Sequence, residues 1–326
     1  MRVDDVVLGC DDLDETVDFF TSALGFRLDV IWPADDPSVA VLSRGPDVGV
    51  RLVRGSAPAV WPAAGDGAVS MPPGSATFEL SHPSGTDTGV GRAGMHYRDL
   101  LPARQGGRFI ASHILIPGGG PVPDYVHHHR VRFQLIYCAA GWVRVVYEGQ
   151  GSPFVLETGD CVLQPPGIRH RVLEASPGLE VVEIGCPAAH ETFVEHTITL
   201  PTAAAAPDRR WDGQAFIRHV AASASWKPWR ASGFELRDTG IEAATDGLAT
   251  VRVLRPCRAD VSVTLPPYEG EFLFWYVLAG TARLHLDGVE PSALAVGSAV
   301  AVPISVAYGL SEVSPDLEVL EVMLPA

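Results

Sequence analysis

The sequence almost lacks lysine. Lys227 is the sole lysine among 24 basic residues, against 39 aspartates and glutamates, and the formal net charge is −15. Such an acidic surface repels phosphate backbones and anionic lipids, so we expect neither a nucleic acid nor a membrane as the main partner. No apolar run of about 18 residues occurs, and the N-terminus turns acidic after one arginine. We therefore expect no membrane span and no signal peptide, and a cytoplasmic location.

Cysteine is also scarce, with five scattered residues and no CxxC spacing. This argues against a disulfide framework and against a zinc-thiolate site. Glycine and proline, by contrast, number 33 and 27, which is too many for a helical bundle. With 326 residues, of which 47% are hydrophobic, the chain is long enough for roughly two to three domains with cores of their own.

The first 54 residues predict a small β-α-β-β-β unit. A strand is expected at 3–9, a helix at 11–24 that ends at Gly25, and three strands at 26–32, 39–43 and 48–54. Residues 55–106 have little periodicity and are rich in Gly, Ala, Pro and Ser, so we interpret them as a linker with one strand near 76–80.

Two copies of one β-domain follow. Short strands separated by turn signals fill residues 107–200, and the same pattern returns in 201–326. The copies align through three pairs of landmarks, which are Gly141 with Gly280, Gly159 with Gly297, and Pro165 with Pro303. The shared register predicts two similar domains.

Histidines in the first copy form a candidate metal site. In a strand, His127 and His129 point to one face and His128 to the other. A histidine run alone is often a solvated strand end, in which case it would bind nothing. A turn after His129 would bring Gln134 back beside it, and His170 follows a Pro-Pro-Gly turn, so the pattern favours a metal.

These residues carry a resemblance to the cupin superfamily. His127, His129, Gln134 and Gly141 follow its first motif, and Gly159, Pro165, Gly167 and His170 follow its second without a gap. Pro121 stands where the first motif opens with glycine, and Gln134 stands in place of the usual glutamate. The resemblance implies a mainly β fold of two double-stranded β-helix (jelly-roll) barrels behind the N-terminal module. It also implies a divalent metal held by His127, His129, Gln134 and His170.

The second copy keeps the landmarks but not the ligands. Pro266, Tyr268, Leu273 and Tyr308 fall at the positions of His127, His129, Gln134 and His170. We expect a degenerate cupin without metal that packs against the first barrel or against another subunit, so a homodimer is one expectation.

The N-terminal unit resembles one module of the vicinal-oxygen-chelate (glyoxalase/bleomycin-resistance) family through DDLDETVDFFTSALGF. The family's histidine and glutamate ligands fall at Asp5 and near Arg51, and only one module is visible, so the resemblance implies a structural or pairing role.

Five further residues are candidates for contact with a substrate. Cys138 shares a strand face with Gln134, and His113 lies in an apolar strand that could line the same barrel, although both also fit inert core positions. Three polar residues flank the motifs and could orient a substrate or simply lie at the surface: Tyr125, Arg132 and Gln164.

Three histidines and a carboxamide form a neutral ligand set, which leaves a divalent ion its full charge. Three functions stay open: an Fe(II) dioxygenase, a non-redox Lewis-acid lyase or isomerase, and a protein that only binds a small ligand. The two-barrel layout with one empty barrel resembles ring-cleaving dioxygenases. We therefore expect a dioxygenase-type oxidoreductase on a small organic substrate, with one ion, iron ahead of manganese, nickel or zinc. The sequence assigns no catalytic residue.

Overall fold

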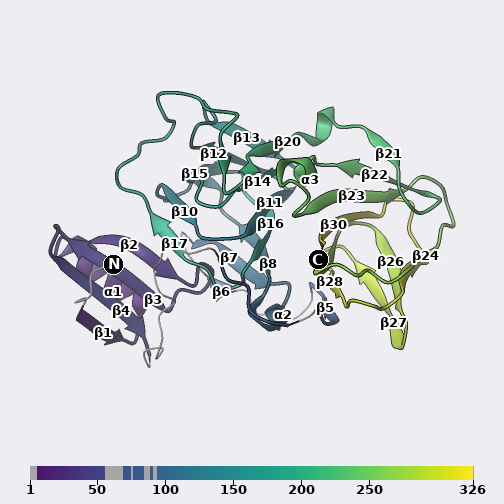
Figure 1. Cartoon of the computed structure of the whole chain (residues 1–326), viewed down its shortest axis with the longest axis horizontal. Helices are drawn as coiled ribbons and strands as arrows, with labels where there is room; N and C mark the ends of the chain where they lie inside the picture. The colour runs from purple at the N-terminus through teal and green to yellow at the C-terminus, as the bar shows by residue number, and fades with distance from the viewer. Residues whose placement is uncertain (1–5, 56–68, 75, 84–88, 91–93, 326) are drawn as a thin grey trace.

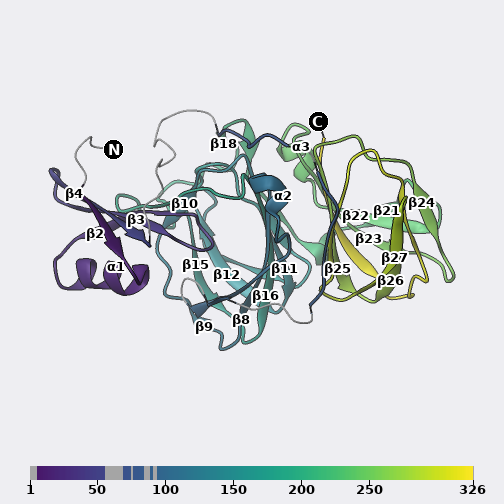
Figure 2. The same cartoon turned by 90° about the horizontal axis from the view of Figure 1, so that it is seen from below.

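The structure is a computed structural model that describes residues 6–55, 69–74, 76–83, 89–90 and 94–325. Three units lie in a row, with a small N-terminal module at one end and two β-barrels beside it (Figures 1 and 2). The fold is mainly β, as predicted, with two barrels and a βαβββ module. Among the described residues, no helix combines the length and apolar character that crossing a membrane requires.

The N-terminal module has the predicted element order. It comprises β1 (Val6–Cys10), α1 (Leu13–Ser22), β2 (Arg27–Trp32), β3 (Val39–Arg44) and β4 (Val48–Arg54). The side chain of Asp12 caps α1 by accepting a 2.9 Å hydrogen bond from the backbone N–H of Glu15. The helix ends two residues earlier than expected, at Ser22, and Gly25 then turns the chain with φ +69°. The expected strand residues 3–5 lie outside the described residues.

The module joins the first barrel through a continuous sheet. Strand β2 pairs antiparallel with β17 (Thr192–Val194), where Ile31 lies opposite Thr192 and Val30 opposite Phe193. Strand β17 pairs in turn with β10 (His127–His129), which carries the histidine run. The module is therefore hydrogen-bonded to the strand next to the candidate metal site.

Two sheets form the first barrel. One contains β10, β17, β9 (Gly120–Pro121), β15 (His170–Ala175), β12 (Trp142–Tyr147) and β13 (Phe154–Glu157). The facing sheet contains β6 (Gly89–Val90), β7 (His96–Asp99), β8 (Ile110–Ile116), β16 (Leu179–Cys186), β11 (Phe133–Ala140), β14 (Cys161–Leu163) and β20 (Ile217–His219).

The second barrel repeats this plan. One sheet contains β21 (Trp226–Pro228), β22 (Phe234–Asp238), β23 (Thr250–Pro256), β30 (Glu318–Leu324), β25 (Phe272–Ala279), β28 (Ala299–Val302) and β5 (Glu79–Ser81). The other contains β24 (Val263–Leu265), β29 (Tyr308–Ser311), β26 (Thr281–Leu286) and β27 (Val289–Ala295). Short elements complete the chain: α2 (Arg104–Gly107), η2 (Ala221–Ser223), α3 (Ile241–Ala244), and the hairpin of β18 (Arg210–Trp211) and β19 (Gln214–Ala215).

The landmark glycines occupy equivalent, sterically closed positions. Gly141 has φ +75° and Gly280 has φ +71°, and an added Cβ would lie 2.3 Å from Ser176 Oγ and 2.4 Å from Ser314 Oγ. The same two hydroxyls accept hydrogen bonds from the backbone N–H groups that follow the glycines. A side chain would therefore displace the serine that closes each turn, which explains why glycine recurs in both copies.

Strands cross between the barrels, which corrects the prediction that 55–106 is a linker. Strand β5 comes from that segment and pairs with β28 of the second barrel, while β7 pairs with β8 of the first. Strand β20 lies beyond residue 201 and nonetheless pairs with β14 of the first barrel. The boundaries between domains 1–54, 107–200 and 201–326 stay predictions.

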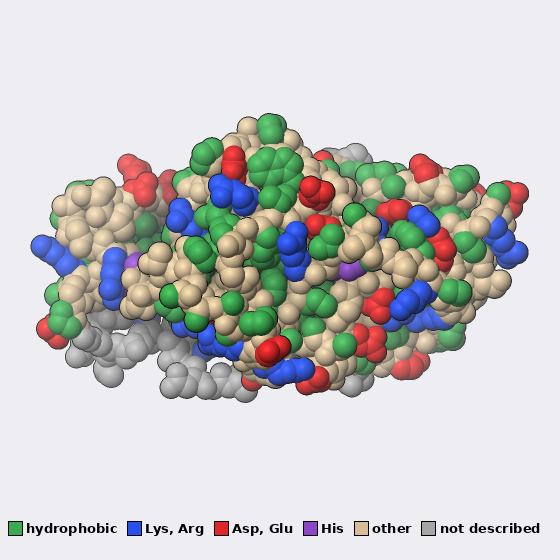
Figure 3. Space-filling view, turned by 90° about the horizontal axis from the view of Figure 1, so that it is seen from above, with side chains coloured by type: hydrophobic (Ala, Val, Ile, Leu, Met, Phe, Trp, Pro, Cys, Tyr) green, Lys and Arg blue, Asp and Glu red, His purple; other side chains and the backbone are tan. Residues whose placement is uncertain are grey.

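A shared core fuses the barrels. It lies between their two seven-stranded sheets and includes Phe109, Phe133 and Leu135 from the first and Phe272 and Phe274 from the second, all fully buried. The rings of Phe109 and Phe272 stack across it with centroids 4.0 Å apart. On the face shown in Figure 3, acidic and basic side chains are interspersed, without an extended basic surface.

Candidate metal centre

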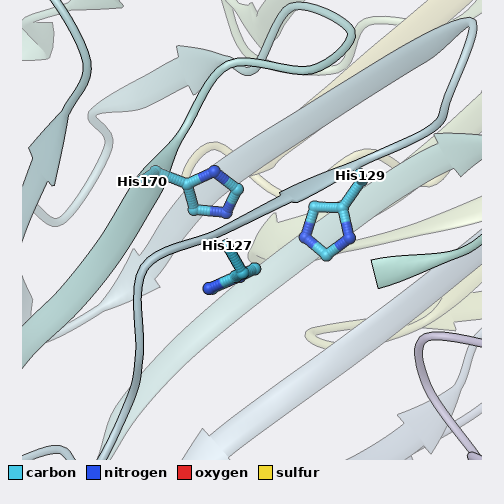
Figure 4. A group of neighbouring side chains, drawn as sticks. All are labelled: His127, His129 and His170. Atoms are coloured by element: carbon cyan, nitrogen blue, oxygen red, sulfur yellow. The ribbon is translucent and has the colours of Figure 1, made fainter. Parts of the chain in front are cut away.

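Three histidines from two neighbouring strands converge in the first barrel (Figure 4). His127 and His129 come from β10, and His170 of β15 lies directly opposite His127. The ring of His127 lies 4.2 Å from that of His170 and 5.1 Å from that of His129, between centroids. One nitrogen of each ring lies within 4.8 Å of the others. In the described part of the chain, no other group of His, Cys, Asp or Glu meets this criterion.

Backbone carbonyls fix the protonation of two of these rings. His127 Nδ1 lies 2.8 Å from the carbonyl oxygen of Tyr125, and His170 Nδ1 lies 3.0 Å from that of Ile168. A carbonyl only accepts, so Nδ1 must carry the proton and Nε2 presents its lone pair. That tautomer is the one that metal ligation through Nε2 requires. His127 and His170 are 1% and 5% exposed, so both rings are held in place.

Polar side chains support the histidines from behind. His129 Nδ1 lies 2.9 Å from the hydroxyl of Thr192, and His127 Nδ1 lies 3.6 Å from Asp124 Oδ1. Asp124 is buried, and its other oxygen accepts a 2.9 Å hydrogen bond from the backbone of Val172. A carboxylate behind a ligating histidine is a common way to orient the ring and raise its basicity.

Gln134 lies in a chain of buried hydrogen bonds. Its Nε2 donates to Glu183 Oε1 at 2.6 Å, and its Oε1 accepts from Gln164 Nε2 at 3.0 Å. Gln164 Oε1 in turn accepts from the hydroxyl of Tyr147 at 2.6 Å. The ring of Tyr147 stacks on His170 with centroids 5.4 Å apart. The Gln134 amide oxygen retains a second lone pair, so ligation by this oxygen stays a prediction.

Two of the five predicted substrate contacts lie at the site. The ring of Tyr125 meets that of His127 edge to face, with centroids 5.7 Å apart. Gln164 is 3% exposed and bonded to Gln134. Tyr125 and Gln164 thus each contact a candidate ligand directly.

Two predicted contacts point elsewhere. Ile114 packs in the core of the first barrel, so the preceding His113 faces outward, where its ring stacks with that of Tyr276 in the second barrel at 6.4 Å. Its Nε2 lies 2.9 Å from Glu180 Oε2. Arg132 also faces the second barrel and pairs with Glu271 at 2.6 Å. Neither side chain faces the candidate ligands, because the second barrel lies against the outer face of β8 and against the segment before β11 that carries Arg132.

Cys138 faces the barrel interior, as strand alternation predicted, but in an apolar environment. It packs with Val143, Val162 and Val181, and its Sγ lies 3.5 Å from the carbonyl oxygen of Gly141. Burial raises the pKa of the Cys138 thiol to about 12, so it remains protonated and inert. Of the two alternatives, the buried inert thiol fits the structure.

His128 lies outside the site, as predicted. Its ring stacks on Phe193 of β17, with centroids 5.1 Å apart and an interplanar angle of 12°. Burial, with the nearby positive charge of Arg169, lowers the pKa of His128 to about 4. The ring is therefore a neutral packing group at the junction with the N-terminal module.

Sequence reasoning missed several residues near the histidines. His190 is 2% exposed, and its ring meets that of His129 edge to face at 5.5 Å. It lies in a loop after β16, where no periodicity reveals its direction. Glu183 shares the inward face of β16 with Gly185, which lies opposite Gln134, so strand alternation together with the pairing register could have found it.

Phenols and apolar side chains stand at the equivalent ligand positions of the second barrel. Leu273 and Tyr308 are 1% and 2% exposed and belong to its apolar core, and Tyr268 packs against that core. The Tyr308 hydroxyl accepts a 2.8 Å hydrogen bond from Arg230. Neutral phenols are poor ligands at neutral pH, so a second metal centre is not expected here.

Comparison with known families agrees with this geometry. The cupin domain model matches residues 112–184, which span strands β8 to β16 and include all four candidate ligands. Residues 112–184 form a cupin domain. The first barrel is therefore the cupin barrel proper, and the second is its structural repeat.

The glyoxalase/bleomycin resistance protein/dioxygenase superfamily model matches residues 2–134. The structure places only β1 to β4 in the N-terminal module, and residues 110–134 of the match already belong to the cupin barrel. Of the two expected ligand positions, Arg51 lies on β4, and Asp5 lies outside the described residues.

Solved structures share the fold. Protein Ylba from E. coli superposes with a TM-score of 0.54 and 12% identity, covering 80% of this chain and 94% of that chain. A variant of oxalate decarboxylase from Bacillus subtilis gives 0.54 and 12%, covering 76% and 77%. Another structure of this enzyme concerns its Mn(II) centres, with 0.54 and 14% over the same shares. Identities this low show the fold alone. No curated protein matches the chain in sequence.

Proposed function

We propose that this protein is a metal-dependent cupin enzyme acting on a small organic substrate. The observation that carries the proposal is the convergence of three buried histidines, two of which have Nδ1 committed to backbone carbonyls. His127, His129 and His170 would hold one divalent transition ion through Nε2, and Gln134 would add its amide oxygen. This donor set suits borderline divalent ions such as iron, manganese, nickel or zinc.

The ligands are neutral, so a bound ion would keep its full charge. When bound, the ion supplies open coordination positions for oxygen chemistry if it is iron, or for polarising a carbonyl group if it acts as a Lewis acid. The residues around it orient the substrate and exclude water. Tyr125 lies against His127, and Tyr147 closes the side behind His170, where burial raises the pKa of its phenol and keeps it neutral.

A dioxygenase-type oxidoreductase is our first assignment, because the set of three histidines leaves room for a chelating substrate and a second small molecule. A non-redox lyase or isomerase is the second, and Glu183 favours it. This carboxylate lies 2.6 Å from Gln134 on the inward face, where it could accept a proton from a bound substrate. A protein that only binds a small ligand is the third.

The polar groups that reach the site indicate the charge of the substrate. Asp124 and Glu183 lie near it, whereas the guanidinium of Arg132, from the segment before β11, pairs with Glu271 of the second barrel. A site with this balance favours a neutral or weakly charged substrate over a dianion. This balance of charges argues against the decarboxylation of oxalate, a dianion, despite the shared fold.

Metal analysis tests the proposal. The protein is purified without added metal and under anaerobic conditions, and the metal content per chain is measured with oxygen uptake against a panel of small substrates. We expect about one ion per chain. Bound iron together with oxygen uptake supports the dioxygenase. Bound manganese, nickel or zinc without oxygen uptake supports the Lewis-acid enzyme. A protein that binds no metal even after reconstitution contradicts both.

A matched pair of variants assigns the ion to this site. His127→Ala should abolish metal binding, because it removes one of three buried imidazoles. His128→Ala, from the same strand, should retain it, because that ring stacks on Phe193 outside the site. Equal metal loss in both variants would mean that the ion depends on the strand rather than on His127.

A further inference from the structure

A fully buried carboxylate lies inside the second barrel. Glu321 of β30 is 0% exposed, and its Oε2 accepts a 2.9 Å hydrogen bond from Trp275 Nε1. Its Oε1 is also buried and has no hydrogen-bond partner among the described residues. A buried acceptor left in this way costs free energy unless a donor reaches it. Oε1 therefore marks a position where a hydrogen-bond donor is missing.

The position of Glu321 is that of Glu183 in the cupin barrel. Glu183 lies opposite Ile136 in the β11–β16 pairing, and Glu321 lies opposite Trp275 in the equivalent β25–β30 pairing. In the first barrel the inward glutamate belongs to the candidate metal centre. In the second the inward glutamate remains although the histidines do not, and arginines now surround it.

Two arginines face Glu321 without closing on it. Arg230 Nη2 lies 3.5 Å from Oε2 and Arg252 Nε lies 3.7 Å from Oε1. Charge-assisted hydrogen bonds are usually about 2.7–2.9 Å long, so neither contact is a closed ion pair. The side chains are 39% and 19% exposed, so both reach from the buried carboxylate towards solvent. Arg230 also rests on the ring of Trp229, 4.9 Å from its centroid.

Two phenols complete the cluster. Tyr308 accepts from Arg230 at 2.8 Å, so its own hydroxyl hydrogen can be donated to a further acceptor. Burial, together with the Glu321 carboxylate, raises the pKa of Tyr268 and of Tyr308 to about 12. Both phenols thus stay neutral donors. They stand at the positions of His129 and His170 of the cupin barrel.

The chemistry of these groups defines a ligand. Two guanidinium groups face one carboxyl group whose pKa is raised by burial, which leaves at least one positive charge to be balanced, and the phenols donate hydrogen bonds. An anion can accept hydrogen bonds from the guanidinium groups and the phenols, whereas Glu321 Oε1 needs a hydrogen-bond donor. We propose that the second barrel binds a small organic anion that carries a hydroxyl or amino group next to its carboxylate, such as a hydroxy acid or an amino acid. Arg230 and Arg252 hold the carboxylate, and Glu321 accepts from the adjacent donor.

Calorimetric titration with glycolate, glycine and acetate tests the proposal. The titrations use full-length protein carrying His127→Ala and His129→Ala, so that binding at the first barrel does not contribute. We expect saturable binding of one glycolate or glycine per chain, and weaker binding of acetate, which lacks the donor. Arg230→Gln and Arg252→Gln should each weaken glycolate binding about tenfold or more, since each removes a charge-assisted hydrogen bond. Arg283→Gln should not, because Arg283 pairs with the exposed Glu312.

Three results would overturn the proposal. They are absence of saturable binding for all probes, undiminished glycolate binding in both Arg230→Gln and Arg252→Gln, and equal affinity for acetate and glycolate, which would remove the role of Glu321. Crystals of the unaltered protein soaked in glycolate provide a measurement that does not depend on the folding of variants. The carboxylate should lie between Arg230 and Arg252, and a glycolate found only elsewhere contradicts the assignment. Because the protein used for calorimetry lacks His127 and His129, the outcome of the titrations is independent of the proposed enzyme function.

Discussion

Gln164 donates its amide N–H to the amide oxygen of Gln134 at 3.0 Å, and this bond fixes which way both amides point. Glu183 Oε1 accepts from the Gln134 nitrogen, so the Gln134 oxygen faces Gln164. The Tyr147 hydroxyl then donates to Gln164. The direction of the whole chain follows from the one carboxylate at its end, and the candidate ligand oxygen is oriented before any ion binds.

We predict that Gln134→Glu destabilises the metal-free protein. The change places a second carboxylate within hydrogen-bond distance of Glu183, where the two charges repel and a buried donor is lost. The expected cost is about 1–3 kcal/mol in the free energy of unfolding, measured by urea titration after chelation. Once metal is bound, the ion offsets part of the repulsion, so the variant should retain metal but change its turnover, because the site carries one more negative charge.

The double variant Gln134→Glu with Glu183→Gln is the matched control. It restores one amide and one carboxylate with their roles exchanged, so most of the lost stability should return. If the double variant is no more stable than the single one, the two residues do not interact as described. Unchanged turnover in Gln134→Glu would place Gln134 outside the ligand set.

Much of the site could be predicted from the sequence because its signals are local. Strand alternation places His127 and His129 on one face, and the turn that precedes His170 returns it to the neighbouring strand. The repeat register rests on turns that only glycine fits, as at Gly141 and Gly280. The alternation and the turns depend on residues close in sequence, whereas the expectation that His170 joins His127 and His129 rests on the resemblance to the two cupin motifs.

Contacts between distant segments could not be predicted in this way. Alternation shows that His113 and Ile114 face opposite sides of β8, but not which side the second barrel covers. The exchange of β5 and β20 between barrels depends on pairing partners more than 50 residues away, which no local pattern encodes. For the same reason the segment 55–106, rich in Gly, Ala, Pro and Ser, is predicted as a linker from its sequence.

The strand exchange predicts that a chain ending at Pro201 will not fold. Truncation removes β20 and leaves the edge of β14 unpaired, and it uncovers Phe109, Phe133 and Leu135, which are fully buried in the shared core. Each large apolar side chain contributes about 1.5–3 kcal/mol through burial, so the loss of these three alone is comparable to the whole stability of a typical domain, about 5–15 kcal/mol. We expect aggregation in size-exclusion chromatography, and recovery when residues 202–326 are co-expressed. A truncated chain that unfolds cooperatively alone would contradict this prediction.

Thiol reactivity tests the interior position of the cysteines. Cys138, Cys161 and Cys186 are fully buried, and burial raises the pKa of Cys138 and of Cys186 to about 12. At about pH 8 these thiols should not react with a disulfide reagent, whereas the exposed Cys257 and the half-buried Cys10 can. We expect at most two of the five thiols to react in the folded protein and all five after denaturation. A fast third thiol that peptide mapping assigns to Cys138 would show that this residue is accessible, and so available for substrate contact.

The ion-pair cluster at the barrel interface yields the last prediction. Glu271 of the second barrel bonds Arg108 at 2.5 Å and Arg132 at 2.6 Å, both from the first, and Arg108 is 8% exposed. Glu271→Gln removes the charge that the two guanidinium groups share and leaves Arg108 buried beside a second cation. Breaking a buried pair costs about 3–5 kcal/mol, and the partial exposure of Arg132 reduces this to about 2–3 kcal/mol.

Glu312→Gln is the control, because its pair with Arg283 on the second barrel is exposed and should contribute less than about 1 kcal/mol. Urea titration compares the two variants, and Glu271→Gln should lower the unfolding midpoint clearly. Added salt should weaken the stabilisation by the exposed Arg283–Glu312 pair more than that by the buried Glu271 cluster. Equal, small effects would mean that the shared apolar core alone fuses the barrels.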